Sequence, residues 1–169
     1  ELRKALADYR RLPGAGAAEL SPDDTPAETC AKVFRASMRA IEETLAILDM
    51  AAFEKAAGLL ARARQRDWYG VGGSAQIARD AAHKCRRVGV RCTVHDDPHM
   101  MLMSAAILRP RDVVIGVSHS GRTAPVLEAV ERARTSGASV IALTNYPQSP
   151  LAQLADAVLC STAQGSPLI

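Results

Sequence analysis

The feature that most constrains this chain is an apolar run at residues 113–117 (VVIGV) that leads into a polar loop at residues 118–123 (SHSGRT). A short run rich in β-branched residues is typical of a strand that is buried on both faces. The residues that follow predict a helix over 123–136, with Pro125 in its first turn, where a missing N–H group does no harm. A buried strand, a polar loop and a helix start together direct backbone N–H groups and hydroxyls toward one point. This construction is typical of an anion site, most often for phosphate.

The composition is that of one α/β domain without a membrane span. The chain has 169 residues, of which 48% are hydrophobic, and this is enough to bury one core. No run of about 18 apolar residues occurs, and a net charge of +3 does not indicate a nucleic-acid partner for this chain. The four cysteines lack C-x-x-C spacing, which favours reduced structural thiols in a cytoplasmic protein over a zinc site or disulfides. We expect neither a metal nor a cofactor.

Short apolar runs alternate with helical patterns through the second part of the chain. Strands are predicted at 68–71, 91–94, 113–117, 139–144 and 157–160, and helices at 75–88, 97–108, 123–136 and from Ser149 onward. Such alternation predicts a parallel sheet covered by helices on both faces. We expect a three-layer αβα sandwich with the flavodoxin-like strand order 2-1-3-4-5.

Two amphipathic helices are predicted ahead of this unit, over 25–48 and 50–64. Thr25-Pro26-Ala27-Glu28 is a capping box with proline at the first helical position, and Asp49 is a cap for the second helix. The first helix carries an apolar stripe of Val33, Phe34, Met38, Ile41, Leu45 and Leu48. The stripe covers one end of the sheet or contacts another subunit, and the pattern does not distinguish the two. Residues 1–12 have apolar side chains at helical spacing, and 13–24 are predicted to be a linker.

Two unusual loops, at residues 70–74 and 118–123, follow the strands that flank the predicted reversal of strand order. Ligands of open parallel sheets bind at this place. The first loop lacks the last glycine of G-x-G-x-x-G and the second is no nucleotide P-loop, so a dinucleotide or nucleotide is disfavoured. The groups available for a ligand are then the hydroxyls of the two loops and the backbone N–H groups at the helix starts. Together they can hold a phosphomonoester without a metal. The hydroxyls are Ser74, Ser118, Ser120 and Thr123. The alternative is that they are ordinary turn and cap hydroxyls.

Other side chains near the loops have more than one interpretation or a favoured role. Asp97 is a helix cap or a contact to the sugar, and His99 contacts ligand, contacts a subunit or is exposed. Arg122 pairs with the phosphate or points to solvent, and a ligand or backbone role is favoured for His119. Three methionines in the helix after the second strand are expected to fill the core: Met100, Met101 and Met103.

At these loops, with Asp96-Asp97-Pro98-His99 between them, the sequence resembles the sugar isomerase (SIS) phosphosugar-binding domain, and within it the effector domain of RpiR-type transcriptional regulators. The resemblance covers roughly residues 30–165. It implies that loop N–H groups around His119 and Gly121 assist the hydroxyls in holding a sugar phosphate. The site expected from the loops and the resemblance is Gly72, Gly73, Ser74, Ser118, His119, Ser120, Gly121 and Thr123. It further implies that 1–24 connect to a DNA-binding helix-turn-helix domain outside this chain, that 25–169 are the SIS domain, and that the family's last helices lie beyond residue 169.

Two functions follow from this resemblance, a sensor and an enzyme. A sensor domain binds a phosphorylated sugar or sugar acid and couples occupancy to DNA binding by the helix-turn-helix domain, in a homodimer or homotetramer. A phosphosugar isomerase needs a base near neutral pH. Neither loop contains Glu or Lys, which leaves His99 and His119, unless the base comes from the missing C-terminus or a neighbouring subunit. The sensor is therefore favoured, and the sequence does not indicate which sugar phosphate binds or whether it induces or represses.

Overall fold

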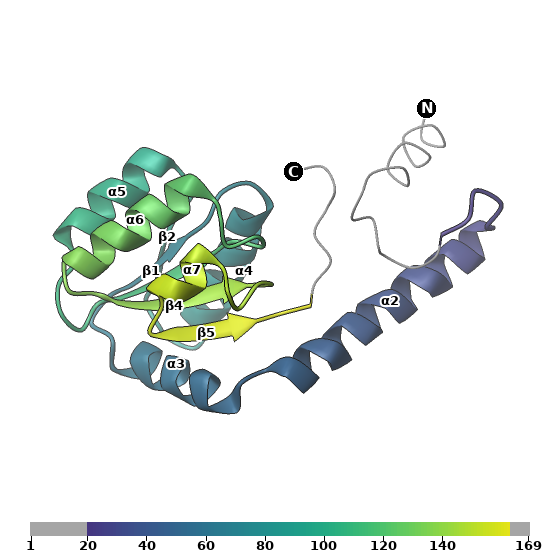
Figure 1. The fold of residues 1–169 in the computed structure, drawn as a ribbon, viewed down its shortest axis with the longest axis horizontal. Helices are drawn as coiled ribbons and strands as arrows, with labels where there is room; N and C mark the ends of the chain where they lie inside the picture. The colour runs from purple at the N-terminus through teal and green to yellow at the C-terminus, as the bar shows by residue number, and fades with distance from the viewer. Residues whose placement is uncertain (1–19, 163–169) are drawn as a thin grey trace. The chain divides into compact units, whose positions relative to one another are not determined.

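The computed structural model describes residues 20–162, which fall into two compact units. The second unit, Leu48–Cys160, contains a five-stranded parallel sheet in the order β2-β1-β3-β4-β5 (Figure 1). Its strands are β1 (Arg66–Tyr69), β2 (Thr93–His95), β3 (Val113–Val117), β4 (Ser139–Thr144) and β5 (Ala157–Cys160). The predicted fold class and strand order are confirmed.

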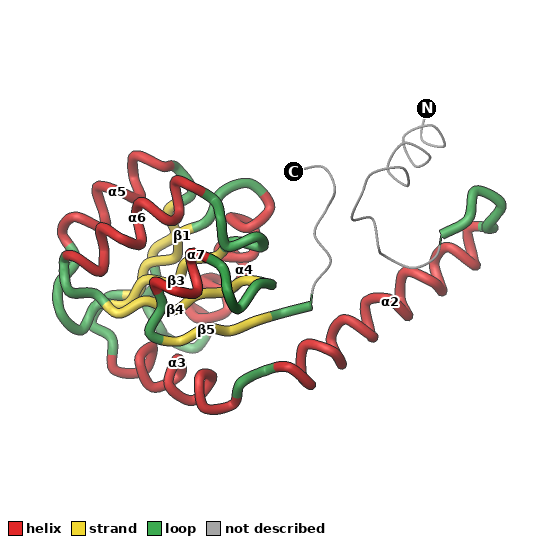
Figure 2. Tube along the Cα trace, viewed as in Figure 1, coloured by secondary structure: helices red, strands yellow, loops and turns green. Residues whose placement is uncertain are grey.

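Helices cover both faces of this sheet, which is the middle layer in Figure 2. They are α3 (Met50–Arg62), α4 (Gly73–Arg87), α5 (Pro98–Ile107), α6 (Ala124–Thr135) and α7 (Pro150–Leu154). One buried cluster joins the sheet to α5, α6 and α7 through side chains such as Met101, Val130 and Leu151. A second joins the other face to α3 and α4 through side chains such as Ala56 and Ala78. Two separate cores therefore fix the position of the central strands.

β3 is buried along its whole length, as its apolar sequence predicts. Its one glycine allows two helices to approach the sheet closely. A Cβ atom at Gly116 would lie 2.9 Å from Leu151 Cδ1 and 3.2 Å from Val130 Cγ2. Close packing of α6 and α7 on this strand holds the loop that follows it.

The predicted bounds of β1 and β2 are wrong by one to two residues. β1 begins at Arg66, whose guanidinium bends back to donate to the Leu60 carbonyl at 2.7 Å, and continues through the buried Asp67. Because Arg66 and Asp67 are charged, the sequence prediction missed the start of this strand. β2 pairs with β1 from Thr93 to His95. It therefore lies one to two residues later in the chain than the prediction of 91–94.

The prediction that all three methionines of α5 fill the core is wrong for two of them. Met101 is fully buried, but Met100 and Met103 are 47% and 53% exposed. α5 has apolar residues around most of its circumference, so only its inner face reaches the sheet. Periodicity alone could not identify that face.

The first unit contains α2 (Pro26–Ile47), which begins with the predicted capping box. The Glu28 N–H donates to Thr25 Oγ1 at 3.2 Å, and the Thr25 N–H donates to Glu28 Oε2 at 2.8 Å. Residues 1–12 and most of the predicted linker lie outside the described residues. Within residues 20–162, no helix is long and apolar enough to cross a membrane.

Candidate functional site

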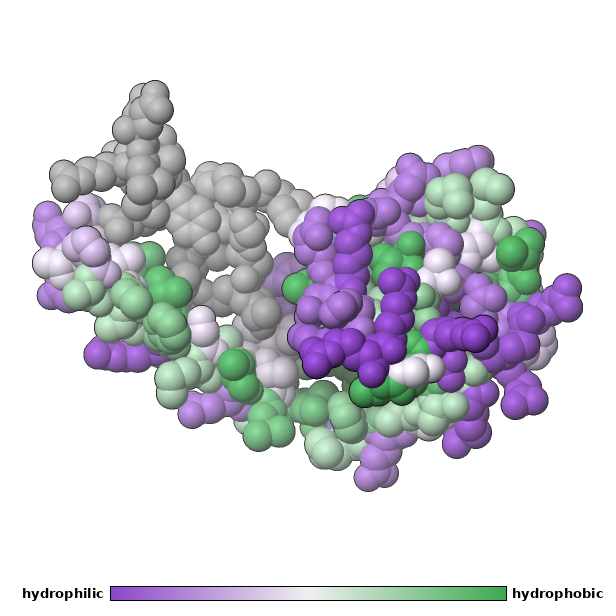
Figure 3. Space-filling view, turned by 180° about the vertical axis from the view of Figure 1, so that it is seen from behind, coloured by the Kyte–Doolittle hydropathy of each residue, from purple (hydrophilic) through white to green (hydrophobic). Residues whose placement is uncertain are grey.

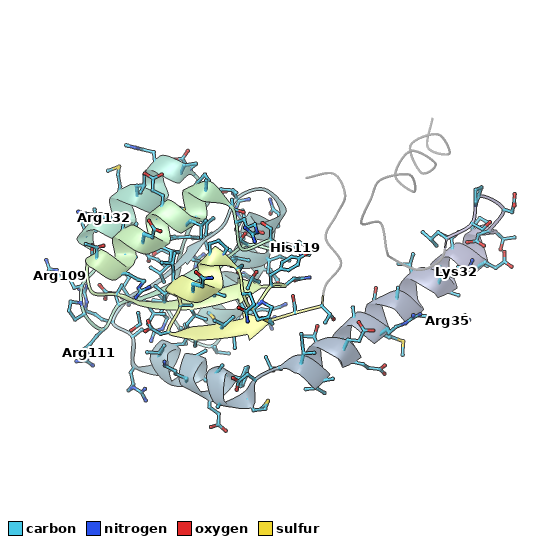
Figure 4. All side chains as sticks on the ribbon, in the orientation of Figure 1. Lys32, Arg35, Arg109, Arg111, His119 and Arg132 are labelled. Carbon is cyan, nitrogen blue, oxygen red and sulfur yellow. The ribbon has the colours of Figure 1, made fainter. Side chains whose placement is uncertain are left out.

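The two predicted loops leave the same edge of the sheet from neighbouring strands. β1 and β3 pair in parallel with Tyr69 opposite Gly116, so both strands end at nearly the same level. Figure 4 shows His119, after β3, at the opposite end of this unit from Arg109 and Arg111, which precede β3. The loops 70–74 and 118–123 therefore lie at the carboxyl edge of the sheet, on either side of the reversal in strand order.

The loop after β3 is closed by hydrogen bonds between its own residues. The Ser118 and Thr123 hydroxyl oxygens lie 2.8 Å apart and share a hydrogen bond. The Gly121 N–H donates to the Ser118 carbonyl at 3.1 Å, and the Arg122 N–H donates to Ser120 Oγ at 3.2 Å. The structure thus brings the three predicted hydroxyls of this loop into one turn.

Residues at the end of β4 and after it hold this loop in place from outside, and sequence reasoning missed them. The His119 carbonyl accepts the Asn145 N–H at 3.0 Å and the Thr144 hydroxyl at 3.1 Å. The Gly121 carbonyl accepts the Leu151 N–H at 3.1 Å. Tyr146 stands edge-to-face on the His119 ring, with 6.0 Å between centroids. The only available signal was the run of polar residues that follows β4.

Gly121 is required where it stands because its φ angle is +62°, in the region that favours glycine. A Cβ atom built there would overlap the Ser149 side chain and lie 2.9 Å from Thr144 Oγ1. The loop backbone therefore packs directly against the start of α7, and the conformation of the turn depends on this contact.

Two helices of the second unit begin without a side-chain cap, and they are the two that follow the predicted loops. α4 begins after Gly72 and α6 after Thr123, and neither residue's side chain accepts a helix N–H group. The other three helices are capped by Asp49, Asp97 and Ser149. Uncapped N–H groups and the positive end of the helix dipole favour an anion. Thr123 is placed as a cap, but its hydroxyl is bound to Ser118 instead.

The first loop is more open than the second. Gly72 has a φ of +57° with nothing within 4 Å of a Cβ atom built on it, and both Gly72 and Gly73 are exposed. Ser74, in the first turn of α4, is half-buried. A Cβ atom at Gly70 would lie 3.1 Å from the Ser74 carbonyl oxygen, so glycine lets the helix start close to the strand end.

The remaining predicted residues differ in exposure. Ser118 is 1% exposed, so its hydroxyl supports Thr123 more than it faces solvent. Ser120 and Thr123 are half-buried, and His119 and Arg122 are exposed. Arg122 is absent from the ion pairs found among residues 20–162.

The predicted sugar-end residues lie at the start of α5. Asp97 Oδ1 accepts the Met100 N–H at 2.9 Å, which confirms the cap that the sequence predicts. His99 is exposed, and no hydrogen bond or ion pair of it occurs among the described residues. The helix cap accounts for the position of Asp97 without a ligand.

Asp97→Ala is expected to lower the free energy of unfolding by about 1 kcal/mol, because it removes a helix cap. Asp97→Asn keeps an oxygen that caps the helix and should retain most of this stability. Urea unfolding of both variants measures the difference. Calorimetric titration of Asp97→Asn with a sugar phosphate then isolates the ligand role, since this variant loses the carboxylate charge but keeps the helix cap.

A polar cluster around one buried acid, Asp67, was also missed. Asp67 is fully buried and accepts hydrogen bonds from the Ser104 hydroxyl and from Gln65 Nε2. His95, for which the sequence offers no partner, has its Nε2 atom 3.3 Å from Asp67 Oδ2. Burial raises the pKa of the Asp67 carboxyl, but the hydrogen-bonding groups of His95, Ser104 and Gln65 together bring that pKa below its usual value.

This lowered pKa predicts a pH dependence of stability with a definite sign. The Asp67 carboxylate stabilises the folded state fully above its unfolded pKa of about 3.9, and this stabilisation is lost as the pH falls through the lower folded pKa. Asp67→Asn should therefore show a smaller loss of stability than the parent chain on acidification below about pH 4. Urea unfolding between roughly pH 6 and pH 3 measures it, and parallel pH profiles would contradict the assignment.

The arrangement can bind an anion but offers no metal centre. Among the described residues, no group of three His, Cys, Asp or Glu side chains lies close enough to hold a metal ion. Hydroxyls, loop N–H groups and two uncapped helix starts converge on the carboxyl edge of β1 and β3. Their chemistry suits a phosphate or a similar oxyanion.

Comparison with known families identifies the kind of domain to which this sheet and its two loops belong. The profile of the SIS domain matches residues 59–166. This chain belongs to the SIS domain family. The matched range contains both loops and all five strands.

Over nearly its whole length the SIS chain also matches RpiR HTH-type transcriptional regulators. The regulator RpiR of Escherichia coli K12 is 44% identical over 173 residues, which cover 99% of this chain and 57% of the relative. The sugar isomerase domain of an RpiR transcription factor from Sphaerobacter thermophilus is 31% identical, with a TM-score of 0.76 over 80% of this chain and 76% of that chain. The chain thus spans a little over half the length of the full-length regulator.

Two further structures bear on the ligand and on the enzyme alternative. The NanR protein of Vibrio vulnificus, solved in complex with ManNAc-6P, is 26% identical with a TM-score of 0.80, over 85% of this chain and 54% of that chain. A Listeria monocytogenes protein described as a sugar-phosphate isomerase has a TM-score of 0.75 at 20% identity, over 83% and 74%. The second likeness shows a shared fold alone.

Proposed function

We propose that this chain is the effector-sensing SIS domain of a transcriptional regulator and binds a phosphorylated sugar or sugar acid between the loops 70–74 and 118–123. The observation that carries the proposal is the pair of uncapped helices. Only α4 and α6 among the helices of the second unit lack a capping side chain, and each follows one of the two loops. An anionic ligand would satisfy both helix starts at once.

The phosphate is assigned to the hydroxyls Ser74, Ser120 and Thr123 and to the N–H groups of Gly72, Gly73 and His119. Gly121 holds the turn, because its N–H donates to the Ser118 carbonyl. Ser118 supports Thr123 through the hydrogen bond between their hydroxyls. Arg122, Asp97 and His99 are assigned to the sugar side or to the rim. A phosphate bound by several charge-assisted hydrogen bonds needs no metal or other cofactor.

Occupancy is coupled, in this proposal, to DNA binding by a helix-turn-helix domain outside the chain. The ligand shifts the regulator toward one state only if it binds that state better. The regulator works in the cytoplasm as a homodimer or homotetramer, and operator DNA contacts the helix-turn-helix domain and not this chain. The similarity to RpiR regulators supports this coupling.

A phosphosugar isomerase is the second candidate because the site loop carries one exposed histidine, His119. An isomerase must remove a proton next to the carbonyl carbon of its substrate. Incubation with a 6-phosphosugar in deuterium oxide, followed by proton NMR, detects that step as exchange at carbon 2. The sensor proposal expects no exchange above the rate without protein, and exchange that is lost in His119→Ala would identify an enzyme.

A thermal-shift screen is the experiment that tests the proposed function. Phosphorylated hexoses, amino sugars (including ManNAc-6P) and sugar acids are compared with inorganic phosphate and the unphosphorylated sugars. A ligand present at about 100 times its dissociation constant stabilises the fold by about 2.7 kcal/mol. We expect one class of sugar phosphate to stabilise the chain and its unphosphorylated sugar to have no effect. Equal stabilisation by both forms would contradict a phosphate site.

A further inference from the structure

Helix α2 exposes an apolar stripe along one side. Phe34, Met38, Ile41 and Leu45 are between 59% and 70% exposed, and no residue of α2 is buried. Figure 3 shows hydrophobic side chains along this helix, interspersed with hydrophilic ones. Large apolar side chains gathered on one helix face indicate a surface that contacts a partner.

The spacing of the stripe is that of a coiled coil. The four residues follow one another at intervals of four, three and four, which places Met38 and Leu45 at a positions and Phe34 and Ile41 at d positions of a heptad. The flanking e positions are then Glu28, Arg35 and Glu42, and the g positions are Cys30, Ser37 and Thr44. Only one flank of the stripe is charged.

The charges on that flank distinguish the two orientations of a pair of identical helices. In a parallel pair each e position faces a g position of the other helix, so that Arg35 would meet Cys30 and Glu42 would meet Ser37, without any ion pair. In an antiparallel pair e positions face e positions. When Phe34 packs against Leu45 of a second copy, Arg35 lies beside Glu42 of that copy, and symmetry makes this pair twice.

The charged flank is free to make these contacts within the described residues. Arg35 and Glu42 are both exposed, and neither belongs to any ion pair found in residues 20–162. Figure 4 labels Arg35 on α2. The g flank is occupied instead, because the Thr162 N–H donates to Thr44 Oγ1 at 3.1 Å and the Thr162 hydroxyl donates to the Ala40 carbonyl at 2.9 Å.

We propose that α2 pairs antiparallel with α2 of a second copy of this chain, with Arg35 of each copy beside Glu42 of the other. The apolar stripe supplies the affinity and the two ion pairs select the orientation and the register. The pairing needs no ligand, so it stands or falls separately from the sugar-phosphate site.

Charge reversal in the 169-residue chain tests the register. Arg35→Glu and Glu42→Arg each replace two ion pairs by two like-charge contacts and should raise the dimer dissociation constant by roughly tenfold, measured by sedimentation equilibrium. The double variant Arg35→Glu/Glu42→Arg restores the opposite charges and should return the constant to within about threefold of the parent. Arg39→Glu, on the outer side of the helix, is the matched control and should leave it unchanged.

Disulfide trapping tests the orientation in a background with Cys30→Ala. A mixture of Phe34→Cys and Leu45→Cys chains should form the mixed disulfide, since these positions face each other only in the antiparallel pair. In that pair, two copies of residue 34 are about 16 Å apart at 1.5 Å per residue, too far for a disulfide. Preferential coupling of Phe34→Cys to itself, a monomeric parent chain, or a double variant as weak as the single ones would each overturn the proposal. Far-UV circular dichroism confirms that every variant retains its helices.

Discussion

Thr123→Val is expected to weaken binding of a sugar phosphate by roughly 10- to 150-fold, because one hydrogen bond to a charged oxygen contributes about 1.5–3 kcal/mol. Valine has nearly the same shape as threonine, so the loop keeps its volume. Ser120→Ala removes a second hydroxyl of the same turn and should have an effect of the same size. Calorimetric titration of each variant with the phosphosugar that stabilises the parent chain most measures both.

Thr123→Ser is the matched control because it keeps the hydroxyl and removes only a methyl group. It should bind within a few-fold of the parent and keep the hydrogen bond to Ser118. Unchanged affinity in both Thr123→Val and Ser120→Ala would remove the loop after β3 from the site. Loss of affinity in Thr123→Ser would show that packing, rather than the hydroxyl, is what the position supplies.

Gly121→Ala is expected to lower the free energy of unfolding by about 2–5 kcal/mol. A left-handed backbone conformation costs an alanine about 1–2 kcal/mol, and overpacking adds about 1–3 kcal/mol. The new methyl group would collide with Ser149 at the start of α7. Since this contact also holds the turn, binding of the sugar phosphate should fall with stability. Urea unfolding and calorimetry report the two losses separately.

Gly72→Ala separates the two causes of that destabilisation. Gly72 has a similar φ, +57°, but its ψ of −129° places it in a different positive-φ region, and a Cβ atom there meets nothing within 4 Å. The substitution should therefore cost only a conformational part, about 1–3 kcal/mol. An equal loss in free energy of unfolding for Gly72→Ala and Gly121→Ala would show that the collision with Ser149 does not destabilise the fold.

The sheet could be predicted from the sequence because its central strands are continuous apolar runs bounded by turn residues. β3 and β4 and the caps at Asp49, Asp97 and Ser149 were predicted where the structure has them. The start of β1 could not be predicted in the same way. Asp67 reads as a loop residue until its partners Ser104 and His95, 37 and 28 residues away in the chain, are known.

The two loops could be located from the sequence, because the binding of ligands at the reversal of strand order can be predicted from the strand order alone. The contacts that hold the loop after β3 in place could not be predicted from the sequence. The hydrogen bonds from Thr144, Asn145 and Leu151 to the loop after β3 join segments more than 20 residues apart, and a single sequence carries no signal of such pairing. The same limit explains Met100 and Met103, since tertiary packing decides which face of an apolar helix is buried.

Chemical-shift mapping of the backbone amides tests the phosphate site most directly. The isotope-labelled chain is titrated with the phosphosugar selected by the thermal-shift screen and, separately, with inorganic phosphate. We expect both to move the amides of residues 72–75 and 119–124 most, because these are the N–H groups of the two loops and helix starts. Largest shifts elsewhere, for example at the amino edge of the sheet around Arg109 and Arg111, with these amides unmoved, would contradict this expectation.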